Sequence, residues 1–439
     1  MGIKNLKKIF DQYCNSAIQN RNLDQYAGLK LGIDVSIFLY KNLYNGGDII
    51  DGFTRMILRL TRNNITPLFI FDGKPPKEKD GILQERREKK DYLNIKKSII
   101  EYTLINKSEN YDIFLKEIMD IIHFEDKDRN VNYRIDEDEI KELFEKNKDQ
   151  LLNDYDKTTK KIIYVTDEHI ILLKKLFDLF GVKYIHEQCE ADLILATLYK
   201  NGTIDGCISE DMDLLANGCK ILLRNFNSSS PYVTEYCLTG ILELLNLSYD
   251  EFIDMCILCG CDYTTKIKGI GHVQAYKNIV RYRNIESVIE ELPIKTNIPD
   301  DFNYVRSREL FKQIVNENIM KNIQRDYCMT KPDINGLISF LSDNSDQIKS
   351  ETIIIISTQL INNYLNISYF NISNDDDQLN KEITVIDNDE INLKKDEETT
   401  QIINYDKSSL LLNIMKNNKQ NEESNSSNNF IEILNMLYR

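Results

Sequence analysis

Several features that would place this 439-residue chain at a membrane or outside the cell are missing. No apolar run approaches the ~20 residues needed to span a bilayer, and the amino end lacks the apolar segment of a secretory signal. Myristoylation requires Ser or Thr at position 6, where Leu6 stands. The nine cysteines are scattered without a paired framework, which indicates a reducing, intracellular compartment.

Net positive charge is also missing, because the formal net charge is -15. Taken alone, this argues against a protein that binds nucleic acid. The acid is unevenly spread, however: residues 374–401 carry ten Asp or Glu against three Lys, whereas residues 74–97 are strongly basic. The average charge therefore does not decide the class of partner.

The chain is long for one core, and its patterning divides it into four parts. Residues 1–100 alternate strand and helix patterns and form a first catalytic region. Residues 101–160 mix short apolar helical patterns with acid and form an insertion. Residues 161–365 resume the alternation and become helical, and residues 366–439 are rich in Asn, Asp and Glu, as in a disordered tail.

Seven acidic residues stand where the chain leaves a strand or enters a helix. Asp34 and Asp72 each end an apolar run, and the others follow a short strand or open a helix. In an open parallel sheet the carboxyl ends of the strands share one edge. Carboxylates gathered there repel one another unless cations hold them, and Mg²⁺ or Mn²⁺ suits such oxygen ligands. The set is Asp34, Asp72, Glu190, Asp192, Asp211, Asp213 and Asp262.

Each acidic residue also has an ordinary interpretation. A lone Asp at a strand end is more often a helix cap, and two acids two residues apart are usually solvated. The joint pattern of seven favours a site for two metal ions, which hydrolyse phosphodiesters when ~4 Å apart. Such a site does not require histidine, of which the chain has four.

Two basic groups of residues have competing interpretations. Arg55, Arg59 and Arg62 fall on one helix face, which is either solvated or in contact with a nucleic-acid duplex. In the stretch 266–271, glycines and free N–H groups before a helix can meet a phosphate. The residues predicted to contact phosphates there are Lys266, Lys268, Gly269, Gly271 and Lys277.

Three cysteines, Cys256, Cys259 and Cys261, have spacing that suggests zinc. No fourth ligand stands nearby, and the surrounding pattern is an apolar helix. We therefore expect these thiols to fill core space.

Several motifs together resemble the flap endonucleases of the structure-specific 5′ nuclease family. The resemblance covers roughly residues 1–100 and 161–365 in family order. It is carried by Met1-Gly-Ile-Lys-Asn-Leu6, Ile33-Asp-Val-Ser-Ile-Phe-Leu-Tyr40, Phe71-Asp-Gly-Lys-Pro-Pro76, Glu190-Ala-Asp192, Glu210-Asp-Met-Asp213, Gly260-Cys-Asp-Tyr263, Gly269-Ile-Gly271 and Lys331-Pro-Asp-Ile-Asn-Gly-Leu-Ile-Ser-Phe340.

The resemblance implies roles for individual residues. The first four acids would serve one Mg²⁺ site and the last three a second, with Mn²⁺ able to substitute. Lys79 and Arg86, seven apart and so on one helix face, would stabilise the charge of the scissile phosphate; a solvated basic helix is the alternative. Tyr40 would stack on the terminal base, unless it is a core tyrosine. Gly2 would contact DNA, and K⁺ would bind at the helix–three-turn–helix element.

The sequence departs from the family at three places. Asp192 stands where relatives carry Glu, the insertion is longer than the family's helical arch, and His272, Val273 and Gln274 replace more basic residues. No sliding-clamp box is recognisable, so a clamp partner is not supported.

The fold that the resemblance implies is an α/β core with a mostly parallel sheet, a PIN-like nuclease architecture. The implied activity is structure-specific cleavage of DNA carrying a 5′ flap, in replication and repair, by a monomer, in the nucleus if the cell is eukaryotic. Three alternatives remain: a 5′ exonuclease or junction-resolving relative, a DNA-junction binding protein without catalysis, and an RNA-directed nuclease on the same core, which the duplex-gripping hairpin disfavours. Nothing in the sequence suggests base-edge readout, so specificity for DNA structure is expected.

Overall fold

The computed structural model describes residues 2–106, 110–119, 135–227, 229–323, 327–345, 348–349, 352–364 and 366–367. The predicted tail, 366–439, lies outside the described residues except for its first two. In the described part of the chain, no helix combines the length and the apolar character that a bilayer crossing would need.

A seven-stranded sheet forms the centre of the molecule, in the order β1-β7-β6-β5-β2-β3-β4. The strands β6, β5, β2, β3 and β4 are parallel, whereas β7 and β1 are antiparallel at one edge. The mostly parallel α/β sheet predicted from the sequence is therefore confirmed. The strands are β1 (Ile18–Asn22), β2 (Lys30–Asp34), β3 (Thr66–Phe71), β4 (Lys183–His186), β5 (Gly206–Ile208), β6 (Ile221–Arg224) and β7 (Tyr232–Cys237).

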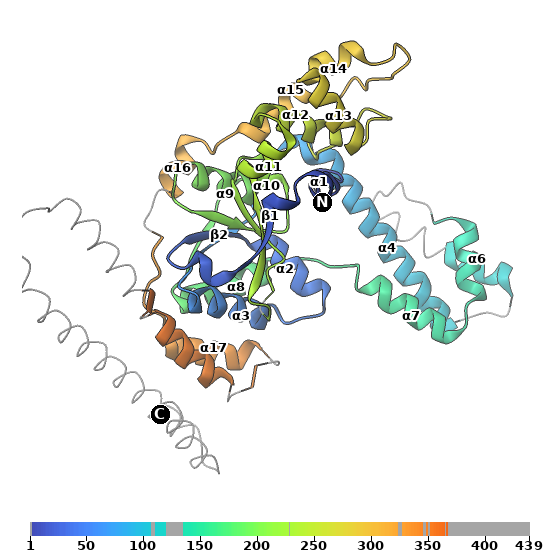
Figure 1. Ribbon diagram of the computed structural model, residues 1–439. Coiled ribbons are helices and arrows are strands. Elements are labelled where there is room, and N and C mark those ends of the chain that lie inside the picture. Colours follow the sequence, from blue (N-terminus) through green and yellow to red (C-terminus); the bar gives the residue numbers. More distant parts are fainter. Residues whose placement is uncertain are drawn as a thin grey trace, which may run out of the picture.

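The alternation of side chains along the strands produces two apolar layers, one on each face of the sheet. In β3, Leu68 and Ile70 join one buried cluster, and Phe69 and Phe71 join the other. Figure 1 shows helices above and below the sheet. The first layer contains α1 (Leu6–Tyr13), α9 (Ala191–Lys200), α10 (Asp213–Ala216) and α11 (Leu238–Leu245); the second contains α2 (Val35–Tyr44), α3 (Ile49–Arg62), α8 (Asp167–Phe180) and α17 (Ile334–Asn344).

The sequence also determines where several of these helices begin and end. Thr166 caps α8 by accepting the N–H of His169, and Gly181 ends the helix in the left-handed conformation with φ of 69°. Asp34 is both the last residue of β2 and the N-cap of α2. The chain therefore turns sharply at Asp34 and leaves its carboxylate at the edge of the sheet.

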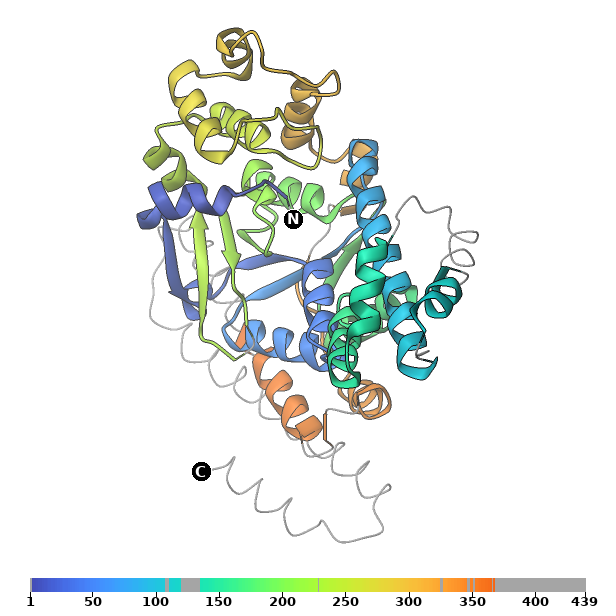
Figure 2. The same ribbon diagram turned by 90° about the vertical axis from the view of Figure 1, so that its right-hand side faces the viewer.

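The insertion is a helical arm that projects from the core (Figures 1 and 2). It begins with α4 (Asp80–Asn106) and contains a helix over 111–119, α6 (Glu137–Glu145) and α7 (Lys148–Thr159). The helix α4 runs through residue 100, where the sequence suggested a boundary, because its apolar pattern continues through Ile95, Ile99 and Ile100. These side chains form a separate buried cluster with Phe114, Ile118 and Leu151. In both views α7 lies alongside α4.

A second helical region follows later in the chain and lies at the top of Figure 1, next to the start of α4. Its first two helices, α12 (Tyr249–Cys259) and α13 (His272–Tyr282), are joined by the turns of residues 260–271, as the helix–three-turn–helix prediction requires. The helices α14 (Ile285–Glu291), α15 (Tyr304–Lys312) and α16 (Glu317–Ile323) follow. A partly buried ion-pair group joins three of these helices: Arg308 of α15 contacts the buried Asp254 of α12 and the more exposed Glu286 of α14.

Candidate active site

The acidic residues predicted as metal ligands are gathered at one edge of the sheet. Asp34 ends β2, Asp72 follows β3, and the loop after β5 carries Asp211 and Asp213. Glu190 is the N-cap residue of α9, which follows β4 and carries Asp192 in its first turn. Asp262 comes from the turn after α12. Four adjacent parallel strands, β5, β2, β3 and β4, thus end at this edge.

Short hydrogen bonds orient the carboxylates near β2 and β3. The N–H of Ala191 donates to Asp72 Oδ1 at 2.9 Å, so the start of α9 directs that carboxylate. The Asp34 carboxylate accepts from Ile37 N–H at 3.3 Å and from the Ser209 hydroxyl at 3.2 Å. The same Ser209 oxygen accepts the N–H of Asp211 at 3.1 Å. Ser209 therefore links the ends of β2 and β5.

The amino-terminal segment lies against the carboxylates that follow β5. The N–H of Ile3 donates to Asp213 Oδ1 at 2.7 Å, and the N–H of Asp213 donates to Asp211 Oδ1 at 3.0 Å. Gly2 has φ of 76°, and a Cβ there would lie 2.3 Å from Asp213 Oδ1. Only glycine fits this approach without a shift of the backbone.

Burial and mutual repulsion raise the pKa values of four of these acids. Burial, with repulsion from Asp72 and Asp211, raises the pKa of Asp34 to about 8. The pKa of Asp192 lies well above its usual value because the carboxyl is buried and faces Asp211 and Asp34. Burial and Asp211 likewise raise the pKa of Asp213, which Asp262 also repels. Burial raises the pKa of Glu190 as well. Such clustering of perturbed acids is typical of functional sites.

The donor set fits divalent cations. Asp192 Oδ1 is buried without a hydrogen-bond partner, so this acceptor is available to a cation. Buried carboxylates that repel one another are stabilised by hard cations, which oxygen ligands bind. In the residues that the structure describes, no three His, Cys, Asp or Glu side chains are already arranged closely enough to hold a metal ion. Two basic side chains instead contact the set.

Lys79 and Arg86 are the two basic side chains, and both reach the carboxylates from the base of the arm. Lys79 follows Pro76 in a short 3-10 helix, and Arg86 lies in the second turn of α4. Lys79 Nζ lies 2.6 Å from Glu190 Oε1. The Arg86 guanidinium lies 2.8 Å from Asp262 Oδ2. The structure thus brings both predicted basic residues into direct contact with predicted metal ligands.

Tyr40 is exposed rather than part of the core, with 42% of its surface accessible. It lines a hollow of about 430 Å³ with Lys41 and Tyr44 of α2, Lys90 of α4 and Lys161. Burial of part of the ring and the charge of Asp72 raise the pKa of Tyr40. An exposed ring beside lysines suits base stacking.

The predicted contacts to a duplex lie outside the carboxylate set. Arg55 of α3 is paired with Asp51 at 2.8 Å, and Arg59 donates to the carbonyl of Asn227. Lys268 and Lys277 are exposed and Lys266 is half-buried. Gly269 has φ of 94°, and a Cβ at Gly269 or Gly271 would meet no atom within 4 Å. The turn therefore leaves its backbone open to a ligand.

Two residues of this site were missed by the sequence reasoning. Ser209 stands between the apolar strand β5 and the acids, where only its position in Ser209-Glu-Asp signals a role. Tyr263 follows Asp262 directly, and its ring lies 5.2 Å from Lys79 Nζ. The sequence singled out Tyr263 only as part of the motif Gly260-Cys-Asp-Tyr263 and assigned no separate role to its ring.

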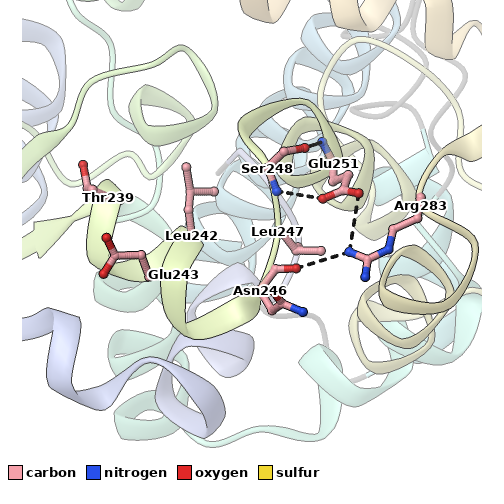
Figure 3. Close-up of a pocket in the computed structure, with 8 residues that line it drawn as sticks. All are labelled: Thr239, Leu242, Glu243, Asn246, Leu247, Ser248, Glu251 and Arg283. Atoms are coloured by element: carbon pink, nitrogen blue, oxygen red, sulfur yellow. Dashed lines mark hydrogen bonds and ion pairs between the residues drawn. The ribbon is translucent and has the colours of Figure 1, made fainter.

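The three cysteines with zinc-like spacing are buried in the apolar cluster beside α12, as expected for core residues. A hollow of about 440 Å³ between α11, α12 and Arg283 also lies apart from the carboxylates (Figure 3). Arg283 donates there to the Asn246 carbonyl and contacts Glu251, which caps α12 with Ser248. None of the predicted site residues lines this hollow.

The chain resembles known proteins in sequence. Residues 1–92 match the XPG N-terminal domain and residues 181–262 match the XPG I-region. The chain is 31% identical over 329 residues to flap endonuclease 1 of Entamoeba dispar, covering 71% of this chain and 75% of that protein. It is 30% identical to flap endonuclease 1 of Danio rerio, covering 78% and 82%.

Solved structures share the fold. The catalytic core of Rad2 in complex with DNA substrate superimposes with a TM-score of 0.55 at 21% identity, covering 80% of this chain and 98% of that one. Flap endonuclease-1 from Methanococcus jannaschii gives a TM-score of 0.51 at 22% identity, covering 80% and 96%. With the sequence relatives, these matches show that the chain belongs to the flap endonucleases of the XPG family.

Proposed function

We propose that this chain is a structure-specific 5′ flap endonuclease, with 5′–3′ exonuclease activity, that hydrolyses DNA near single-strand/duplex junctions during replication and repair. One observation carries the proposal: seven carboxylates from five chain segments meet at one sheet edge, and Lys79 and Arg86 face them. Relatives at about 30% identity are flap endonucleases, and Rad2 has been solved with DNA substrate.

Two Mg²⁺ ions, or Mn²⁺, would be held by the seven carboxylates and would neutralise the scissile phosphate and lower the pKa of an attacking water. Lys79 and Arg86 supply further positive charge where the phosphate charge develops. Because Lys79 now pairs with Glu190, and Arg86 with Asp262, both must exchange these partners for the phosphate. Ile3 N–H and Ala191 N–H keep Asp213 and Asp72 in place meanwhile.

Other residues select the form of the DNA. Exposed Tyr40 stacks on the base at the junction, independently of its sequence. Lys266, Lys268 and Lys277, together with the open backbone at Gly269 and Gly271, would contact the phosphates of the duplex. The same turns would be the site for K⁺. Arg55 and Arg59 of α3 and Gly2 complete the proposed DNA contacts.

The test is a 5′-flap DNA labelled at its 5′ end, incubated with and without Mg²⁺ beside an Asp211→Asn variant. Release of the intact flap with Mg²⁺, absent in the variant, is the expected result. Release of single nucleotides would make the chain primarily an exonuclease. Tight junction binding without cutting in Mg²⁺ or Mn²⁺ would refute the nuclease and leave a binding protein.

A further inference from the structure

Lys79 is held from two sides, and one of them is an aromatic ring. Its Nζ lies 2.6 Å from Glu190 Oε1 and 5.2 Å from the centre of the Tyr263 ring. Only 12% of the Lys79 side chain is exposed. Tyr263 is itself 9% exposed and belongs to the apolar cluster around α12. The ammonium is therefore confined between a carboxylate and a ring.

The ring has a fixed orientation. Phe311 of α15 packs edge-on against it, with centroids 5.0 Å apart and planes inclined by 75°. The neighbouring residue Asp262 is tied to Arg86 across the site. The packing therefore fixes the position of the Tyr263 ring, which would stay in place if Lys79 moved.

The two partners of Lys79 differ in what they leave available. An ion pair with Glu190 uses an N–H donor and an oxygen that the proposed function assigns to a metal ion. An aromatic face attracts the ammonium through its quadrupole and consumes no acceptor, so the ammonium keeps its three N–H donors. Glu190 competes with the phosphate for Lys79, whereas Tyr263 does not.

We propose that Tyr263 is a positioning residue, which holds the Lys79 ammonium at the carboxylate edge once Glu190 is engaged elsewhere, so that Lys79 meets the scissile phosphate. This inference rests on the proposed nuclease function. The alternative is that Tyr263 only fills the core. The two differ in what a leucine at this position would do to the chemical step.

Cleavage is measured with saturating flap DNA under single-turnover conditions for Tyr263→Leu, Tyr263→Phe, Lys79→Ala and the double variant Lys79→Ala/Tyr263→Leu. Tyr263→Leu is expected to lower the cleavage rate about 3- to 30-fold without weakening junction binding. This range spans cation–π contacts from exposed to desolvated sites. Tyr263→Phe keeps the ring and restores most of the rate. The double variant should be no slower than Lys79→Ala, because without Lys79 the ring has nothing to position.

Tyr236→Leu is the matched control. Tyr236 is buried in the same cluster, and the Arg224 guanidinium lies 5.4 Å from the centre of its ring. Among the described residues, Tyr236 makes no side-chain contact with the proposed site. It should destabilise the fold without the selective loss of rate. An equal loss of cleavage rate in Tyr263→Leu and Tyr236→Leu would show that Tyr263 only fills the core.

A measurement on the protein without metal or DNA tests the position of Lys79 independently of the proposed nuclease function. In protein labelled with ¹³C-lysine, the Lys79 signals, identified by their loss in Lys79→Arg, are expected upfield because the ammonium lies over the ring. Tyr263→Phe should retain this shift and Tyr263→Leu should lose it. An unshifted Lys79 signal, or additive losses in the double variant, would overturn the inference. Absence of cleavage by the wild type would instead refute the proposed function.

Discussion

Replacing Leu151 with alanine is expected to loosen the arm without unfolding the core. Leu151 of α7 is 2% exposed and belongs to the same buried cluster as Ile95, Ile99 and Ile100 of α4. Truncating a buried leucine costs about 2–5 kcal/mol. The neighbouring Leu152 is 44% exposed, so its truncation should cost less than about 0.5 kcal/mol and provides the matched control.

This loss of stability predicts a change in the rate of amide hydrogen exchange. Since about 1.4 kcal/mol corresponds to a factor of ten, a loss of 2 kcal/mol raises the local opening constant about 30-fold. Amide hydrogen exchange detects such local opening. In protein free of DNA, the amides of residues 95–106 should exchange about 30-fold faster in Leu151→Ala than in the wild type. They should exchange at least about tenfold faster than in Leu152→Ala, which itself loses up to about 0.5 kcal/mol, whereas β2 and β3 remain protected.

Hydrogen bonds between α4 and its neighbouring helices offer an alternative explanation for the stability of the arm. Tyr155 of α7 donates to Glu101 of α4 at 2.8 Å, and Tyr92 of α4 donates to Glu139 of α6. If these alone held the arm, both leucine variants would exchange alike. Equal exchange in the two variants would therefore refute the buried cluster as the support of α4.

Three further outcomes follow from the site and the helical region. In EDTA the melting temperature should fall between about pH 5 and pH 8, because the raised pKa of Asp34 lets the folded state keep a proton that the unfolded chain has lost; Mg²⁺ should restore most stability at pH 8, Asp34→Asn should flatten the profile in part, since Asp192 and Asp213 also have raised pKa values, and a rise with pH would contradict it. Gly2→Ala should slow single-turnover flap cleavage at least about tenfold. The left-handed backbone of residue 2 alone costs an alanine roughly 1–2 kcal/mol, and the added Cβ would collide with the Asp213 carboxylate. An unchanged rate would show that this collision does not disturb Asp213. Arg308→Met should lower the free energy of unfolding, measured in urea, by about 3–5 kcal/mol, because it leaves the buried carboxylate of Asp254 without its ion-pair partner. The double variant with Asp254→Asn should recover part of this lost stability. No recovery would show that the loss comes from the packing of the Arg308 side chain and not from the unpaired charge.

The strand-end acids could be predicted because each follows an apolar run or opens a helix. Parallel pairing of β2 with β3 and β5 then brings them to one edge, which is a property of the topology and needs no knowledge of side-chain contacts. The contact of Lys79 with Glu190 could not be predicted, since it joins residues 111 positions apart through the placement of α4.

Other parts of the structure leave weak signals in the sequence. The strand β1 reads Ile-Gln-Asn-Arg-Asn, with no apolar alternation, because it lies at the sheet edge and pairs only with β7. The insertion was divided into short helical patterns, yet α4 and α7 pack along each other over a small core of their own. Tyr263 and Ser209 act through neighbours that only the folded chain brings close.

The interleaved strand order has a consequence for how such a chain can be divided. Strands from after the insertion (β7, β6, β5 and β4) lie on both sides of β2 and β3, which precede it, so neither half contains a complete sheet or a complete set of acids. Two polypeptides separated within the insertion would each lack a partner surface and would assemble only together. A gene split at that point would thus yield a nuclease that exists only where both halves are expressed.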